Sequence, residues 1–147
     1  MSFVLDNSVA LTWCFEEERT PATADLLEQV GEAGAVAPML WPLEALNGLL
    51  VAERRGRLDA DRRRLLVSFL SALPIELDEE TAGRVWTETS RLAERFRLSS
   101  YDAAYLELAQ RRRLPLASLD QDLRAAAFAL GLTVLGSDDT AMHRPQA

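Results

Sequence analysis

Four acidic residues stand where the pattern of apolar residues predicts that strands end or helices begin. Asp6 follows the apolar run 3–5, Asp120 follows the run 114–119, and Glu44 and Asp102 fall in the first turns of predicted helices. Carboxylates gathered in one place repel one another, so they need a cation or a retained proton. A hard divalent ion such as Mg²⁺ prefers oxygen ligands, and it can activate a bound water for phosphoryl transfer. The four residues therefore indicate metal-dependent hydrolysis of phosphodiesters.

Each carboxylate taken alone also has a purely structural explanation. Aspartate favours helix N-caps, so Asp6 and Asp120 are expected to cap the helices that follow them. Ser99 and Asp102 have the spacing of a capping box, and Glu44 suits the first turn of a helix that opens with proline. For any single residue the structural role is the favoured interpretation. Because there are four such residues, and two of them are expected at the same edge of the sheet, a shared site is favoured over four separate structural roles.

Other catalytic arrangements lack the residues that they require. His143 is the only histidine and lies in the polar end of the chain, and Cys14 is the only cysteine. A serine or cysteine triad, a histidine-ligated zinc site and a thiolate cluster are therefore excluded. All 16 basic residues are arginine, and no glycine-rich phosphate loop is present. This composition removes Schiff-base chemistry and the P-loop lysine, which leaves the carboxylates as the chemical groups.

The elements that must position these carboxylates alternate between short strands and helices. Alternation of this kind predicts an α/β fold with a central parallel sheet flanked by helices. Ligands of such sheets collect beyond the carboxyl ends of the strands, where Asp6 and Asp120 are expected to emerge. Within the helix that begins at Pro42, the leucines 43, 46, 49 and 50 are expected to form the buried stripe. Strands are predicted at 2–5, 36–38, 75–77, 114–119 and 133–135, and helices at 7–15, 21–34, 42–56, 59–73, 79–97, from 99, and 121–131.

Composition and charge set limits on the whole chain. The 147 residues are 48% apolar, which predicts one domain over 1–136 followed by a polar tail over 137–147. The apolar start is broken by Asp6 and no apolar run has membrane-spanning length, so we expect a soluble cytoplasmic protein without a secretory signal. The net charge of −7 argues against a broad cationic surface for nucleic acid, although acidic residues around a metal remain compatible with a phosphodiesterase.

Arginine triplets and tryptophans leave two interpretations open. The arginines within 54–57, 62–64 and 111–113 could hold phosphates. The favoured alternative is that those at 54, 55 and 111–113 complement the negative ends of two helices. Trp13, Trp41 and Trp86 could stack on bases, but at apolar helical positions they are more often core or dimer-interface residues.

Four segments occur in an order that is typical of one known family. They read Val-Leu-Asp-Asn-Ser-Val at 4–9, Pro-Leu-Glu-Ala-Leu-Asn-Gly-Leu at 42–49, Leu-Ser-Ser-Tyr-Asp-Ala-Ala-Tyr-Leu at 98–106 and Leu-Ala-Ser-Leu-Asp at 116–120. With these segments the chain resembles the PIN-domain ribonucleases, specifically the VapC-type toxins of bacterial toxin–antitoxin pairs. One departure is Arg113, which stands where the turn before the fourth segment often carries glycine.

The resemblance implies a PIN-like α/β/α sandwich and assigns a role to each acidic residue. Asp6 and Asp102 would be the principal ligands of one or two Mg²⁺ or Mn²⁺ ions. Glu44 and Asp120 would complete the acidic pocket directly or through water. Supporting polar or acidic side chains are implied at Ser8, Asn47, Ser118 and Asp122.

The resemblance also implies partners, and it leaves alternatives. It implies an RNA substrate, a cognate VapB-like antitoxin that occupies the groove of the toxin, and a homodimer. The alternatives are an RNA-processing enzyme that is not a toxin, a DNA or flap-type nuclease, and a catalytically silent binding module.

Overall fold

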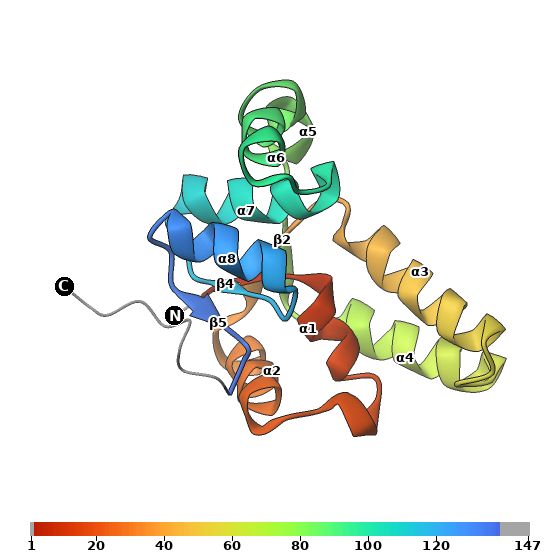
Figure 1. Ribbon diagram of the computed structural model, residues 1–147. Coiled ribbons are helices and arrows are strands. Elements are labelled where there is room, and N and C mark those ends of the chain that lie inside the picture. The colour runs from red at the N-terminus through yellow and green to blue at the C-terminus, as the bar shows by residue number, and fades with distance from the viewer. Residues whose placement is uncertain (1, 139–147) are drawn as a thin grey trace.

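The computed structural model describes residues 2–138, so His143 and the predicted tail from 139 onward lie outside the described residues. Within residues 2–138, five strands form one sheet in the order β3-β2-β1-β4-β5, and every neighbouring pair is parallel (Figure 1). The predicted α/β class with a parallel sheet is confirmed. The strands are β1 Val4–Leu5, β2 Ala35–Pro38, β3 Ile75–Asp78, β4 Leu116–Ala117 and β5 Val134–Leu135.

Helices connect the strands and cover the sheet. The helix α7 lies against β1, β2 and β4, and α6 packs on α7 away from the sheet. Helices α3 and α4 lie side by side and project from the body of the molecule (Figure 1). The helices are α1 Asn7–Thr12, the 3₁₀ turn η1 Glu16–Glu18, α2 Pro21–Ala33, α3 Trp41–Arg54, α4 Ala60–Ala72, α5 Thr81–Arg84, the π-helical turn η2 Val85–Thr89, α6 Ser90–Phe96, α7 Ser100–Arg112 and α8 Gln121–Ala129.

Local sequence signals explain where several helices begin and end. Thr20 and Thr23 form a reciprocal capping box at the start of α2, which ends at Gly34. Gly34 has a φ of 75°, and a Cβ there would lie 2.9 Å from the carbonyl oxygen of Pro74, so the close approach of two chain segments requires glycine. Arg113, at the position where the family often has glycine, adopts the left-handed conformation with a φ of 55°. The turn before β4 is therefore made with arginine.

The helix α7 is the central helix of the core. Its residues from Ala103 to Ala109 are all buried, because the sheet covers one of its faces and η2, α6 and α8 cover others. The two ends of α7 therefore have fixed positions relative to the sheet. Asp102 lies at the first end, and Arg111 lies at the second.

The predicted buried stripe of α3 is wrong in part. Leu43 is 73% exposed and Leu46 is also exposed, whereas Leu49 is buried as expected. The buried face is formed by Trp41, Ala45, Leu49 and Ala52, which recur at intervals of three and four residues. Small alanines allow this face to approach its neighbours closely, so residue size and not hydrophobicity alone selected the inner face.

The predicted helix over 79–97 is interrupted. The chain forms α5, then the wider π-helical turn η2, and then α6. Trp86 lies in η2 and is 89% exposed, while Trp13 and Trp41 are buried. The core interpretation therefore holds for two of the tryptophans. None of the helices within residues 2–138 is both long and apolar enough to cross a membrane.

Candidate active site

Asp6 is buried at the carboxyl end of β1, and its side chain is held by two hydroxyl groups. Its Oδ2 accepts hydrogen bonds from Ser8 Oγ at 2.6 Å and from Ser118 Oγ at 2.8 Å. The same hydroxyls accept from the backbone N–H groups of Leu119 and Asp120. Asp6 is the N-cap residue of α1, yet its side chain makes no capping hydrogen bond. The expected capping role is therefore not realised, and the carboxylate is directed to the neighbouring strand end.

Asp120 lies at that neighbouring strand end, because β4 pairs with β1 in parallel. Its Oδ1 accepts a hydrogen bond from the backbone N–H of Leu123 at 2.9 Å, so it caps α8 as expected. Asp102 occupies the first turn of α7, where its backbone N–H donates to Ser99 Oγ at 3.1 Å. The hydroxyl of Ser99 performs the capping, so the carboxylate of Asp102 does not.

Glu44 comes from the first turn of α3 and is fixed by a residue that the sequence did not single out. Its Oε1 accepts a hydrogen bond from the hydroxyl of Tyr105 at 2.7 Å. Tyr105 is fully buried in α7, one turn after Asp102. The spacing of Asp102 and Tyr105 along one helix was readable from the sequence, but the pairing with Glu44, 61 residues away, was not.

The pKa values show that these carboxylates act on one another. Burial, followed by the charges of Asp6 and Asp120, raises the pKa of Asp102 from 3.8 to about 6. Burial and the charges of Asp6 and Asp102 raise the pKa of Glu44. Burial is the main cause that raises the pKa of Asp6, against the lowering effect of the Ser8 and Ser118 hydroxyls. We call Asp6, Glu44, Asp102 and Asp120 the acidic cluster.

The donor set of the acidic cluster suits a hard cation, although it is not a closed cage. Among residues 2–138, no three Asp, Glu, His or Cys side chains converge closely enough to hold a metal ion by themselves. Mg²⁺ typically takes one or two carboxylates and completes its coordination with waters and substrate phosphates, so an open acidic cluster fits this ion. The charge of Asp6 contributes to the raised pKa values of both Glu44 and Asp102, and the charge of Asp120 contributes to those of Asp6 and Asp102.

The supporting residues named from the sequence fall into two groups. Ser8 and Ser118 contact Asp6 directly, as described above. Asn47 is exposed one turn after Glu44 on α3, and within residues 2–138 its side chain makes no hydrogen bond. Asp122 is exposed in the first turn of α8, and its charge contributes to the raised pKa of Asp102.

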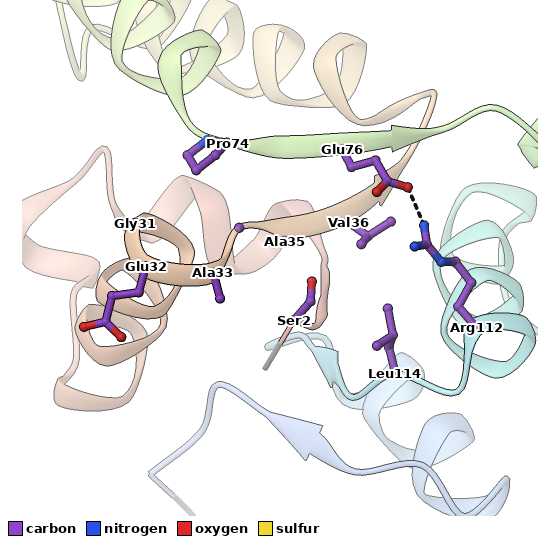
Figure 2. A pocket seen from close by; sticks show the side chains of 11 residues that line it. Ser2, Gly31, Glu32, Ala33, Ala35, Val36, Pro74, Glu76, Arg112 and Leu114 are labelled. Carbon is purple, nitrogen blue, oxygen red and sulfur yellow. Dashed lines mark hydrogen bonds and ion pairs between the residues drawn. The ribbon is translucent and has the colours of Figure 1, made fainter.

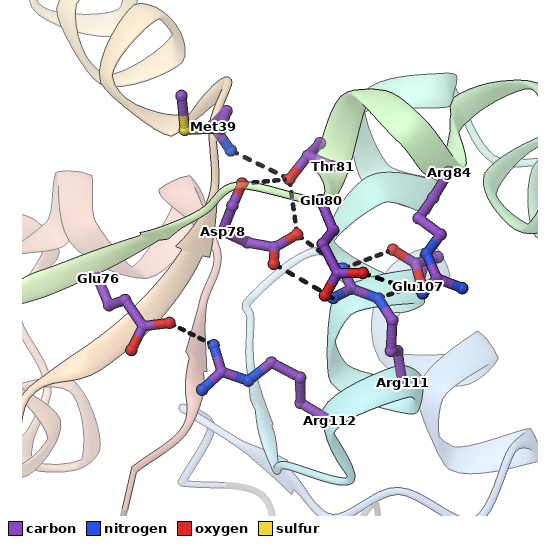
Figure 3. Close-up of polar contacts among 9 residues, drawn as sticks. All are labelled: Met39, Glu76, Asp78, Glu80, Thr81, Arg84, Glu107, Arg111 and Arg112. Carbon is purple, nitrogen blue, oxygen red and sulfur yellow. Dashed lines mark hydrogen bonds and ion pairs between the residues drawn. The ribbon is translucent and has the colours of Figure 1, made fainter.

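A second group of charged residues lies at the other end of α7 and has a different character. Arg111 pairs with Asp78 at 2.6 Å, with Glu107 at 2.8 Å and with Glu80 at 3.2 Å (Figure 3). We call these four residues the Arg111 cluster. Burial raises the pKa of Asp78, but hydrogen bonds from Arg111 and Thr81 and the Arg111 charge outweigh burial and lower it. Arg111 therefore holds the end of β3 and the start of α5 against α7.

Three hollows of the surface lie away from the acidic cluster. One of about 540 Å³ opens at the amino ends of the strands, between Gly34 and Leu114, and the Arg112–Glu76 ion pair forms part of its lining (Figure 2). Another of about 380 Å³ is apolar and lies between α3 and α4. The third, of about 510 Å³, borders the Arg111 cluster. None of the three is lined by any of the four carboxylates of the acidic cluster.

The fold and the acidic cluster together define a class of α/β protein with carboxylates gathered at the carboxyl edge of a parallel sheet. The profile of the PIN domain matches residues 3–144, and the chain belongs to the PIN-domain family. The resemblance noted in the sequence and the expected PIN-like fold are thereby confirmed. PIN domains are generally nucleases and typically use divalent metals, so the class of hydrolase that cleaves nucleic acid is supported.

Solved structures share this fold. PAE2754 from Pyrobaculum aerophilum has a TM-score of 0.65 and 24% identity, over 86% of this chain and 84% of that chain. VapBC2 from Rickettsia felis, bound to a DNA fragment from their promoter, has a TM-score of 0.64 and 15% identity, over 94% of this chain and 100% of that chain. FitAcB from Neisseria gonorrhoeae has a TM-score of 0.62 and 16% identity, over 91% and 96%. No curated protein matches the sequence.

Proposed function

We propose that this PIN domain is a Mg²⁺-dependent endoribonuclease and the toxic component of a type II toxin–antitoxin pair. The observation that carries the proposal is the acidic cluster, in which the charges of Asp6, Asp102 and Asp120 raise the pKa values of neighbouring carboxylates at one edge of the sheet. Membership of a nuclease family supports the hydrolysis of nucleic acid. The VapBC2 and FitAcB neighbours support the toxin–antitoxin setting.

Asp6 and Asp102 would hold Mg²⁺ or Mn²⁺ by their carboxylate oxygens. The bound ion would supply an activated water and would neutralise charge that develops on the phosphate. Ser8 and Ser118 keep the carboxylate of Asp6 in one orientation by donating to its Oδ2. Glu44 and Asp120 would complete the acidic pocket, either directly or through water. The proposed mechanism uses only carboxylates and a metal-bound water, and it assigns no role to a histidine base.

The experiment is an assay of purified protein on labelled RNA and on DNA of the same sequence. We expect cleavage of RNA in Mg²⁺, its loss in excess EDTA, and its abolition by Asp6→Asn and by Asp102→Asn, because each change removes a principal ligand. Asp25→Asn, on the exposed face of α2, is the matched control and should cleave as the unmodified protein does.

The alternatives correspond to distinct results of the same assay. Equal cleavage of the matched DNA would indicate a DNA or flap-type nuclease, because recognition of the 2′-hydroxyl separates the two substrates. Cleavage of neither substrate would indicate a silent binding module. Full RNA cleavage by the Asp6→Asn, Asp102→Asn double variant would contradict the metal mechanism.

The toxin role has its own test in cells. Expression of this chain should arrest growth, and coexpression of the short adjacent reading frame that encodes a VapB-like antitoxin should relieve the arrest. An absence of arrest by a protein that cleaves RNA in vitro would favour RNA processing. We further propose that the protein forms a homodimer, which the exposed Trp86 on η2 supports. We also propose that it is cytoplasmic, which the single free cysteine, Cys14, supports.

A further inference from the structure

The hydroxyl of Tyr105 is buried, and it has one hydrogen-bond partner among residues 2–138. Tyr105 is fully buried, and its hydroxyl donates to Glu44 Oε1 at 2.7 Å. A buried phenol without an acceptor would be costly, so the side chain depends on the carboxylate as much as the carboxylate depends on it. Burial and the charge of Glu44 raise the pKa of Tyr105, so its hydroxyl stays protonated and remains a donor at neutral pH.

The placement of Tyr105 connects two helices of the acidic cluster. Asp102 and Tyr105 are three residues apart on α7, which puts them on the same face of that helix. Glu44 comes from α3, and its carboxylate is repelled by the charges of Asp6 and Asp102. Without a donor, this repulsion and the free rotation of a glutamate side chain would favour positions away from the cluster.

The hydrogen bond to Tyr105 opposes that displacement and selects one orientation of the carboxylate. Oε1 is occupied as an acceptor, while Oε2 accepts no hydrogen bond from any residue in 2–138. The second oxygen therefore remains available for a metal ion or for a water bound to it. A donor that orients a ligand carboxylate typically changes metal affinity when it is removed.

We propose that Tyr105 is a positioning residue that holds Glu44 Oε2 toward the metal bound by the acidic cluster, an inference that rests on the proposed metal-dependent function. Tyr105 acts through Glu44 and touches neither metal nor substrate. Its contribution is to metal affinity, and it is separate from the packing of its ring.

The first test measures Mn²⁺ binding by calorimetry at pH 7.5. We expect Tyr105→Phe to weaken Mn²⁺ affinity about tenfold, at the lower end of the loss usual for such orienting groups. Tyr101→Phe makes the same change on the same helix at an exposed position, and it should leave the affinity unchanged. In a Glu44→Gln background, Tyr105→Phe should cause no further loss, because the carboxylate through which it acts is absent.

A second measurement does not depend on the stability of Tyr105→Phe. The chain has two tyrosines, so 3-fluorotyrosine incorporated into the Tyr101→Phe protein labels residue 105 alone. Its ¹⁹F resonance should shift as Mg²⁺ is added and reach a plateau, and Glu44→Gln should remove this response. The fluorine lies beside the hydroxyl and responds both to its hydrogen bond and to ring packing, so the comparison with Glu44→Gln identifies the part of the response that passes through the Glu44 carboxylate.

Different results overturn different parts of the account. Unmodified protein that binds no Mn²⁺ would overturn the proposed function and this inference together. Binding by the unmodified protein with equal affinity in Tyr105→Phe would overturn only the inference. A further loss caused by Tyr105→Phe in the Glu44→Gln background, or a ¹⁹F resonance that ignores Mg²⁺, would also overturn it.

Discussion

The two ends of α7 carry carboxylates in opposite electrostatic settings. At the first end, Asp102 joins the acidic cluster, and burial with like charges raises its pKa to about 6. At the second end, Glu107 and Asp78 contact Arg111, and the pKa of Asp78 is lowered although burial alone would raise it. Both clusters contain half-buried or buried acids held by hydrogen bonds. The difference between the two clusters is that Arg111 supplies a positive charge to the second one.

This difference separates groups that stabilise the fold from groups that are available for chemistry. In the Arg111 cluster, each buried carboxylate has a cation within 3 Å, so its charge is compensated. In the acidic cluster the charges of Asp6, Glu44 and Asp102 act on one another. An uncompensated set costs folding stability, and the same property makes it a strong attractor for a divalent cation.

The largest effect is expected from removing the cation of the Arg111 cluster. Arg111→Met keeps the apolar stem but leaves Asp78 and Glu107 buried without their partner, which should lower the free energy of unfolding by about 3–5 kcal/mol. Arg91→Met breaks the exposed Arg91–Glu88 pair and is the control, with an expected loss of at most about 1 kcal/mol. Urea denaturation measures both, and equal losses would show that the Arg111 cluster is no more important than a surface pair.

A smaller effect of opposite sign is expected from removing a charge of the acidic cluster. The folded-state pKa of Asp102 lies above 3.8, so between about pH 4 and 6 the folded chain binds more protons than the unfolded chain. Stability contributed by this group is therefore lost as pH rises through about 6. Asp102→Asn should remove this loss and stabilise the metal-free protein at pH 7.5 by about 1 kcal/mol, after allowance for solvent screening of a half-buried group.

The measurement for Asp102→Asn is urea denaturation in EDTA from pH 4.5 to 7.5. The variant should show a flatter dependence on pH than the unmodified protein, with a remaining slope from Asp6 and Glu44, whose pKa values are also raised. Asp78→Asn should destabilise at pH 7.5, because the lowered pKa of Asp78 contributes stability that is fully present above its ordinary value of 3.8 and is lost only as pH falls below that value. If Asp102→Asn destabilised the protein as much as Asp78→Asn does, the two clusters would not differ in how their charges affect stability.

The smallest effect concerns Asp120, which belongs to the acidic cluster and also caps α8. Asparagine caps as well as aspartate, so Asp120→Asn should keep stability within about 0.5 kcal/mol, while Asp120→Ala should lose about 1 kcal/mol. Both variants should lower RNA cleavage, because both remove the charge. Asp59→Ala removes the cap of α4 and should lower stability without changing cleavage. Full cleavage by Asp120→Asn would limit Asp120 to its structural role.

The sequence predicted most of the fold because apolar periodicity and helix signals were strong. The strand ends at Asp6 and Asp120 were placed from short apolar runs, and parallel pairing of β1 with β4 then brought them to one edge. The inner face of α3 was missed because alanines at 45 and 52 are buried there, while the more apolar Leu43 is exposed. The π-helical turn at Val85–Thr89 gives no signal in apolar spacing, and the chain was read as one continuous helix.

Contacts between distant residues were the part that sequence could not supply. The order of motifs named Glu44 and Asp102, but the bond from Tyr105 to Glu44 depends on how α3 meets α7. The sequence could not reveal the role of Arg111 either. An arginine near the end of a helix is explained by the negative end of the helix dipole as well as by an ion pair, and the sequence does not distinguish the two. Three-dimensional packing alone distinguishes Arg111, which joins three elements, from Arg113, which ends a helix in the left-handed conformation.

The bond from Ser118 to Asp6 spans 112 positions of the chain and has a consequence during translation. Asp6 leaves the ribosome 112 residues before Ser118, and most of this domain is made between the two. A nascent chain therefore lacks the partner strand β4 that places Asp6 beside Asp120, and contacts so distant in sequence form late. In a partly synthesised chain the acidic residues are therefore still apart. The site is complete only after β4 has been made and has paired with β1.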